Sequence, residues 1–170
     1  MKKLLSVLTS VLMALSIVAP IQAEENVVGI STEKEFIEAV SDNVTESIVL
    51  NNDIELNENV HINKEFVIDF NGNTITYDGV INEDKNGPAG LIDVETNGSL
   101  TIKGNGKITY NKAEDGGYMN SDSTGYCLRL QGNAYLKVEN GTFDAGLTCI
   151  QAGDSSKAVI IDGVFRADFD

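Results

Sequence analysis

Apolar and polar positions change their spacing once along this chain, near residue 45. Up to that point the apolar residues recur as on one side of a helix, and Thr32 to Glu35 has the pattern of a capping box. Beyond it, short segments alternate with a period of two, beginning at residues 48–50, 54–56 and 60–62. Asn-Gly pairs and similar turn sequences separate these segments. The pattern predicts a helix over residues 33–40, followed by many short strands of an all-β fold.

An internal repeat specifies the kind of all-β fold. Residues 127–130 recur at 149–152 and residues 141–145 recur at 163–167, both after 22 positions, and residues 136–138 align with 159–161 after 23. Residues 100–102 and 66–68 continue the series at larger offsets, which leave room for inserts of about a dozen residues. Repeats that carry strands and no helix predict a parallel β-helix, a solenoid of about 5–6 rungs with neighbouring rungs ~4.8 Å apart.

The first residues have the features of a secretory signal peptide. Lys2 and Lys3 precede an apolar run over residues 4–21, and Ala23 follows as a small residue at a cleavage point. The expected organisation is a signal peptide at 1–23, a linker at 24–30, an N-terminal cap with the short helix at 31–47, and the β-helix at 48–170. An uncleaved membrane anchor is the alternative. After cleavage no membrane span is expected, and the predicted location is secreted or at the cell surface.

Charge and composition remove several classes of function. Twelve Lys and Arg residues face 26 Asp and Glu residues, for a formal net charge of −14. This acidity argues against nucleic acid as a partner, because nucleic-acid binding needs a basic surface. One His and two Cys are too few for a four-ligand zinc site of the usual kind. No metal site of that kind is therefore predicted.

Two segments resemble a known superfamily. Residues 50–54, with the sequence Leu-Asn-Asn-Asp-Ile, and residues 68–76 resemble the opening rungs of secreted right-handed β-helix proteins of the pectate-lyase-like superfamily. The helix before them resembles the cap over the first rung of those proteins. The resemblance implies a right-handed single-stranded coil, similar to bacterial surface and adhesin-like members. It does not imply an activity, because the superfamily includes lyases, hydrolases, adhesins and phage spikes.

The repeat also predicts which residues stack in columns, at equivalent positions of neighbouring rungs. The expected inward columns are Ile68, Ile102, Val138 and Ile161; Ile75, Ile108, Phe143 and Phe165; and Leu128 over Ile150. The expected outward columns are Asp69, Lys103, Glu139 and Asp162; Asp93, Arg129 and Gln151; and Thr109, Asp144 and Arg166. Opposite charges are neighbours in each outward column, which predicts surface ion pairs contributing about 0–1 kcal/mol each.

Cys127 and Cys149 occupy the same position on neighbouring rungs. Alternation places both side chains on the outer face, beside Arg129 and Gln151. Their Cα atoms are then ~5 Å apart, within the range of a disulfide, and an exported protein can retain such a bond. A stacked pair of free thiols is the alternative that this spacing leaves open.

Two inserts follow the same three-residue sequence, Ile-Thr-Tyr, on neighbouring rungs. They span residues 78–90 and 111–125, and they are expected to emerge from one edge of the coil, where repeat proteins commonly bind their partners. The candidate ligand-binding residues are Tyr77, Asp78, Asp84, Tyr110, Asp115, Tyr118 and Asp122. Carboxylates with aromatic rings suit sugar hydroxyls or a calcium ion, and no other cofactor is expected. The alternatives are solvated acidic loops without a ligand, and tyrosines that close the core at a corner.

These observations favour a non-catalytic β-helix protein, adhesin-like or carbohydrate-binding, with an extracellular glycan or surface protein as partner. A polysaccharide lyase or glycoside hydrolase is the first alternative, for which Asp93 and Arg129 are the best available pair of catalytic residues. A purely structural piece of a larger surface protein is the second. The final predicted strand has no cap after it, which predicts self-association through the C-terminal rung or truncation of a longer protein.

Overall fold

The computed structural model describes residues 26–77, 90–110, 126–145 and 148–167. They form one helix, α1 (Glu33–Ser41), and three sheets in which all pairing is parallel. Sheet 1 contains β1 (Val27–Ile30), β2 (Ser47–Leu50), β5 (Glu65–Asp69), β8 (Ser99–Lys103), β11 (Tyr135–Val138) and β14 (Lys157–Ile160). Sheet 2 contains β3 (Ile54–Leu56), β6 (Thr74–Tyr77), β9 (Lys107–Tyr110), β12 (Thr142–Ala145) and β15 (Val164–Ala167). Sheet 3 contains β4 (Val60–Ile62), β7 (Gly90–Val94), β10 (Tyr126–Leu130) and β13 (Thr148–Ala152).

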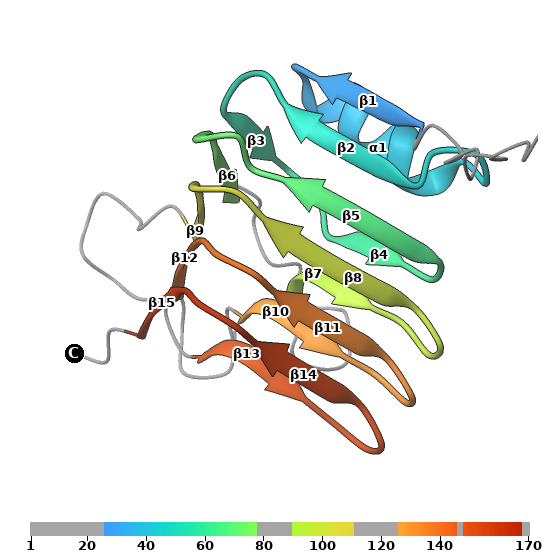
Figure 1. Cartoon of the computed structure of the whole chain (residues 1–170), viewed down its shortest axis with the longest axis vertical. Helices are drawn as coiled ribbons and strands as arrows, with labels where there is room; N and C mark the ends of the chain where they lie inside the picture. The colour runs from blue at the N-terminus through green and yellow to red at the C-terminus, as the bar shows by residue number, and fades with distance from the viewer. Residues whose placement is uncertain (1–25, 78–89, 111–125, 146–147, 168–170) are drawn as a thin grey trace, which may run out of the picture.

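From β2 onward the chain visits sheets 1, 2 and 3 in turn, and we call each such circuit a rung. Circuits begin at β2, β5, β8 and β11, and β14 with β15 continues into a further one. Successive rungs lie side by side along one direction, with α1 at one end and β13, β14 and β15 at the other (Figure 1). The predicted all-β architecture of stacked parallel strands after one short helix is confirmed.

Most of the predicted columns are confirmed by the strand register. Ile75, Ile108, Phe143 and Phe165 follow one another through sheet 2, and Leu128 pairs with Ile150 in sheet 3. The rings of Phe143 and Phe165 stack with centroids 4.9 Å apart and planes 6° from parallel. Phe70 approaches Phe143 from the other side, at 6.3 Å. The interior between the sheets is therefore filled by ladders of equivalent apolar side chains.

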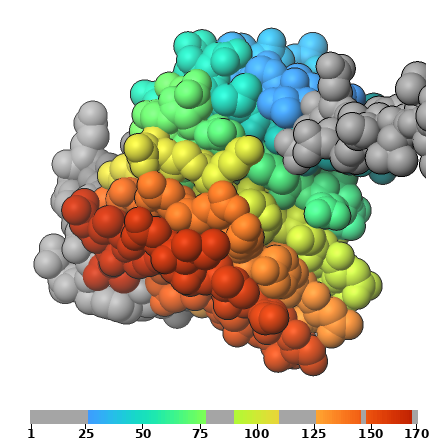
Figure 2. Space-filling model, in the orientation of Figure 1, coloured from blue at the N-terminus to red at the C-terminus, as the bar shows by residue number. Residues whose placement is uncertain are grey.

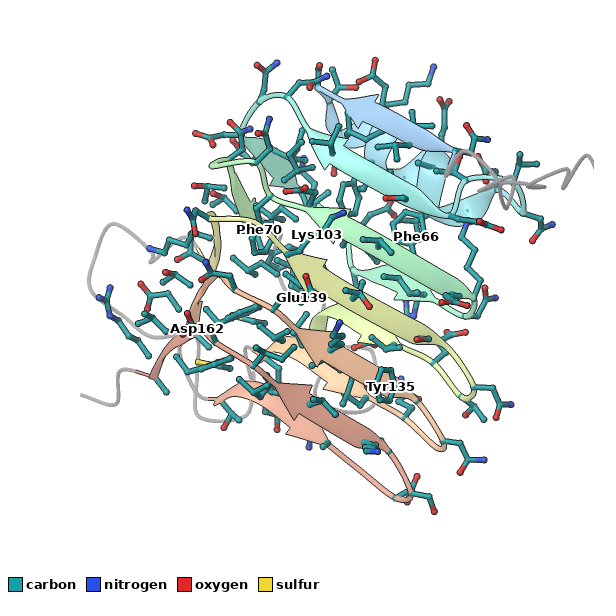
Figure 3. All side chains as sticks on the ribbon, viewed as in Figure 1. Phe66, Phe70, Lys103, Tyr135, Glu139 and Asp162 are labelled. Atoms are coloured by element: carbon teal, nitrogen blue, oxygen red, sulfur yellow. The ribbon has the colours of Figure 1, made fainter. Side chains whose placement is uncertain are left out.

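One predicted column is wrong at its last member. The register pairs Val138 with Ile160, so the repeat of 22 positions holds in sheet 1 as well and the offset of 23 was incorrect. Ile161 is consequently exposed outside the interior. Asp162 lies in the turn after β14 instead of beside Glu139, and Figure 3 shows it well apart from Lys103 and Glu139. Between the last two rungs the same offset of 22 therefore holds in all three sheets.

The ion pairs partly follow the predicted columns. Lys103 lies 4.0 Å from Asp69 on the neighbouring strand. Glu139 instead pairs with Lys137, two residues before it on the same face. Asp144 pairs with Lys107 at 3.0 Å. Long lysine side chains reach diagonally across a sheet. A column therefore predicts which charged residues lie near one another better than it predicts which two form an ion pair.

The capping helix begins as the sequence predicts, with Thr32 as N-cap. Its hydroxyl accepts a hydrogen bond from Glu35 N, and the Glu35 carboxylate accepts one from Ser31 N at 2.8 Å, one residue earlier than an ideal capping box requires. The helix buries Phe36, Ala39 and Val40 and contacts β1, β3 and β4. Residues 24–30 were expected to be a linker, but within them β1 pairs with β2. An edge strand of this kind is hard to predict because it is short and lies outside the repeat.

The end of α1 is held by a lysine from the second rung. Lys64 Nζ donates to the carbonyl of Ala39 at 3.0 Å and to that of Asp42, and it lies 5.0 Å from the centre of the Phe66 ring. A cation at a helix C-terminus satisfies free carbonyls and interacts favourably with the helix dipole. Hydrogen bonds from Thr45 N, the Thr45 hydroxyl and Val44 N, with a smaller effect of the Lys64 charge, lower the pKa of Asp42 to about 2, so this carboxylate is ionised beside Lys64 at neutral pH.

We expect Lys64→Met to lower the free energy of unfolding by about 1–2 kcal/mol, because the methionine stem keeps the packing on Phe66 while the charged hydrogen bonds are lost. Urea denaturation followed by circular dichroism measures this loss. Lys34→Met is the control, since Lys34 is an exposed residue of α1 whose ion pair with Glu38 spans one helical turn. Equal losses in the two variants would contradict the role assigned to Lys64.

Candidate functional site

Polar side chains form one column across sheet 3, in a fold otherwise filled by apolar ladders. The register pairs His61 with Asp93, Asp93 with Arg129, and Arg129 with Gln151. The order Asp93, Arg129, Gln151 is as predicted from the repeat, but the expectation that this column lies on an exposed face is wrong for Asp93, which is buried. His61 joins them from β4. The sequence analysis did not predict this neighbour, although Val60-His61-Ile62 and Ile92-Asp93-Val94 share the same apolar-polar-apolar pattern.

The buried Asp93 forms an ion pair with Arg129, whose side chain is partly exposed. The Asp93 side chain is 1% exposed and receives hydrogen bonds from two atoms of Arg129: Nε reaches Oδ1 at 3.0 Å and Nη2 reaches Oδ2. Gly90 N also donates to Oδ1, at 2.9 Å. Burial raises the pKa of Asp93 from its ordinary value, although the hydrogen bonds and charge of Arg129 act in the opposite direction. The carboxylate is held by donors on both oxygens.

His61 lies at the more exposed end of this column. Its Nδ1 is 3.2 Å from Glu95 Oε1 and 3.9 Å from Asp93 Oδ2, and its side chain is 54% exposed. A carboxylate at Nδ1 orients an imidazole and leaves Nε2 for other partners. Glu95 follows β7 directly, so β7 positions both carboxylates near His61, those of Asp93 and Glu95.

The arrangement of Asp93 and Arg129 suits structure better than proton transfer. A general base must bring a free lone pair within hydrogen-bond reach of a substrate proton. Asp93 is buried and already accepts three hydrogen bonds, two of them from a guanidinium in the bidentate geometry of a strong ion pair. The ion pair also depends on glycine at residue 90. A Cβ there would crowd the pair, at 2.7 Å from Asp93 Oδ1 and 2.9 Å from Arg129 N.

The two predicted inserts leave the sheets from neighbouring strands. Tyr77 at the end of β6 pairs with Tyr110 at the end of β9, and the chain returns at Gly90 and Tyr126, which also pair. The ends of both inserts therefore lie one above the other on both sides. Asp78, Asp84, Asp115, Tyr118 and Asp122 lie outside the described residues, as does the side chain of Tyr110.

Tyr77 has a role that the sequence had left open. Its side chain is buried, and its hydroxyl donates to Asn59 Oδ1 at 3.3 Å. Asn59 in turn donates to the carbonyl of Gly90. Burial raises the pKa of the Tyr77 hydroxyl. This chain of contacts ties the end of β6 to the start of β7, so Tyr77 closes a corner of the core, as one of the two interpretations of the sequence had it.

The outward placement of Cys127 and Cys149 is wrong. Both are buried free thiols. Cys127 Sγ lies 3.9 Å from the carbonyl oxygen of Ile108, and Cys149 Sγ lies 3.3 Å from that of Phe143. Both thiols thus face the strands of sheet 2, which cover that side of β10 and β13. Burial raises the pKa of both thiols, which disfavours the reactive thiolate form.

Two findings on metal binding and membrane spans concern the described part of the chain. No group of three or more His, Cys, Asp and Glu side chains within it is arranged to hold a metal ion. Calcium stays a prediction, because its candidate ligands fall in residues 78–89 and 111–125. Across the described ranges, no helix has the length and apolar character needed to cross a membrane.

No protein-family model matches the chain, and no curated protein and no solved structure is significantly similar to it.

Proposed function

We propose that this chain is a non-catalytic, right-handed parallel β-helix of the pectate-lyase-like type, exported from a bacterial cell, which binds an extracellular glycan with its two stacked inserts. The observation that carries the proposal is the pairing of the insert ends, Tyr77 with Tyr110 and Gly90 with Tyr126. Neighbouring inserts rich in carboxylates, amides and tyrosine offer hydrogen-bonding groups and rings at one edge, which suit sugar hydroxyls and sugar ring faces.

The ion pair of Asp93 and Arg129 supports binding over catalysis. These residues were the best catalytic pair in the sequence, and Asp93 is engaged by Arg129, by Gly90 N and by the nearby His61. A lyase needs a base of suitable pKa with access to a proton, and a glycosidase needs two carboxyl groups that converge on one bond. Asp93 supplies a carboxylate that is buried and already paired, and so it supports neither mechanism.

A panel of neutral and acidic polysaccharides, with and without calcium, tests this function. Binding and product formation are measured on the same samples of the exported chain. We expect binding without product, and we expect Tyr110→Ala and Asp115→Asn each to weaken it by about tenfold or more, equivalent to about 1.4 kcal/mol. Calcium dependence would assign the carboxylates to a bound ion.

Tyr135→Ala is the matched control. Tyr135 is a half-buried tyrosine of β11 on sheet 1, and its strand neighbours are Ser99 and Lys157 (Figure 3). We expect it to leave binding unchanged. Release of shortened or unsaturated sugars would overturn the non-catalytic assignment and favour the lyase or hydrolase alternative. Binding that survives both insert variants would place the ligand elsewhere.

A further inference from the structure

Asparagine side chains link successive turns between sheet 1 and sheet 2. The turns that follow β5, β8 and β11 lie in a row along the stack (Figure 1), and Figure 2 shows the last two of these rungs, yellow and orange, in contact on one face of the molecule. Asn140 Nδ2, in the turn after β11, donates to Asn105 Oδ1, in the turn after β8, at 2.6 Å. Asn105 is exposed and Asn140 is half-buried, so water reaches this pair.

Asn140 also contacts the residue that follows it. Gly141 N donates to Asn140 Oδ1 at 2.7 Å, so the side-chain carbonyl group lies beside the backbone nitrogen of the next residue. The two hydrogen bonds are compatible, because the Asn140 side chain donates through its nitrogen to Asn105 and accepts through its oxygen from Gly141. The same contact recurs one rung further, where Gly163 N lies 2.8 Å from Asp162 Oδ1. The turn itself therefore sets this geometry.

This contact places a nucleophile beside an electrophile. In an asparagine-glycine sequence the glycine nitrogen can attack Cγ of the asparagine side chain, because glycine has no Cβ to shield its nitrogen. Holding two reacting groups in contact accelerates such a step. Since Gly141 N lies 2.7 Å from Asn140 Oδ1, it is also close to Cγ, which is one bond away from that oxygen.

The three other Asn-Gly pairs among the described residues are arranged differently. Gly98 N, which follows Asn97, donates to the backbone carbonyl of Glu95 at 2.8 Å. Asn71 Nδ2 donates to the carbonyl of Leu50 on the preceding rung at 3.1 Å. The remaining pair supplies the acceptor of the bond between the turns. In each of these pairs the glycine nitrogen or the asparagine side chain is engaged by a different group.

We propose that Asn140 is a self-modification site, at which the folded chain converts this asparagine into aspartate and isoaspartate. Gly141 N attacks Cγ and forms a new C–N bond, the bond from Cγ to Nδ2 breaks, and ammonia leaves with the proton of the glycine N–H. One water molecule then opens the resulting succinimide ring at either carbonyl. Opening at one carbonyl gives aspartate. Opening at the other gives isoaspartate, in which the backbone runs through the former side chain.

Isoaspartate lengthens the turn by one backbone atom. The turn is held at both ends, since Glu139 N donates to the carbonyl of Ile102 and Thr142 N donates to that of Gly106, each at 2.8 Å. The neighbouring rung fixes both acceptors, so a longer connection has to bulge or release one of these bonds. Conversion also replaces the amide that donates to the neighbouring turn by a carboxylate, which has no proton to donate. The modification therefore loosens the contact between these two rungs.

Peptide mapping of the exported chain during incubation in mildly alkaline buffer tests the proposal. Tandem mass spectrometry locates each conversion by the mass change from amide to carboxyl. In the folded protein we expect Asn140 to convert at least about tenfold faster than Asn97, because only its glycine nitrogen is held at the side chain it attacks. In urea the two rates should become similar, since glycine follows both residues. A folded chain in which any of the three other described pairs converts as fast as Asn140 would overturn the proposal.

Asn105→Ala removes the acceptor that orients the Asn140 amide, and it is expected to slow conversion at Asn140 severalfold. Asn133→Ala is the matched control, since Asn133 is an exposed asparagine in the turn at the other end of β11. We expect this control to leave the rate unchanged. An unchanged rate in Asn105→Ala as well would overturn the positioning role of Asn105.

Asn140→Asp tests the structural consequence, because it introduces the new charge without lengthening the backbone. Converted protein is separated from unconverted protein by ion exchange on its added negative charge. We expect the converted protein to unfold at a lower urea concentration than the Asn140→Asp variant. Equal midpoints would contradict the loosening of the two rungs.

Discussion

Replacing Phe143 by alanine is expected to lower the free energy of unfolding by about 3–5 kcal/mol, the usual cost of removing a buried phenylalanine ring. Phe143 is fully buried, with the ring of Phe165 stacked on one side and Phe70 on the other. The loss combines the burial of the ring with the cavity left between two rungs. Urea denaturation of dilute protein, followed by circular dichroism, measures it.

Phe165→Ala is the control, because it changes the same residue type in the same column. Phe165, on β15, keeps 38% of its surface exposed, so a smaller part of its ring surface is transferred from water on folding. We expect its loss to be less than half that of Phe143→Ala in the monomer. Equal losses would mean that the two rings are equally buried in solution, contrary to the structure.

Arg129→Met is expected to lower the free energy of unfolding by about 3–5 kcal/mol at neutral pH, the cost of leaving one member of a buried ion pair without its partner. Methionine keeps much of the apolar stem of the arginine. The substitution strands the buried Asp93 carboxylate, with Gly90 N as its closest remaining donor at 2.9 Å. Thermal and urea denaturation both measure this loss.

The loss should depend on pH. Burial raises the pKa of Asp93 above 3.8, and the hydrogen bonds and charge of Arg129 lower it, so the Arg129→Met variant has a higher pKa still. A carboxyl whose pKa is raised by folding binds its proton more tightly in the folded chain. Its ionised form therefore destabilises the fold increasingly as the pH rises through the folded pKa. The deficit of the variant is largest at neutral pH and shrinks as the medium is acidified.

Two further variants separate this effect from simple loss of packing. Gln151→Met changes the next member of the column and is expected to cost little at any pH. In the double variant Asp93→Asn/Arg129→Met, the uncharged amide needs no cation, so part of the stability should return and the pH dependence should vanish. A deficit in Arg129→Met that is independent of pH would show that the ion pair is not its cause.

Short-range and repeated features of this fold follow from the sequence. Thr32 starts the helix because a hydroxyl at that position accepts from the first free N–H groups, and this needs only neighbouring residues. The internal repeat assigns most column neighbours, because parallel strands one rung apart keep one register. Arg129 as the neighbour of Asp93 and the pairing of the insert ends are of this kind.

Only the tertiary structure determines which side chains of a column are buried and which sheet they contact. Alternation assigns Cys127 and Cys149 to the outer side of their strands, but strands of sheet 2 lie against that side and bury the two thiols. The closed geometry of Asp93 and Arg129, with Gly90 near them, likewise depends on how close the backbones approach. A one-dimensional repeat determines which residues are neighbours along the stack. Burial depends on how separate sheets meet, which is a property of the folded chain in three dimensions.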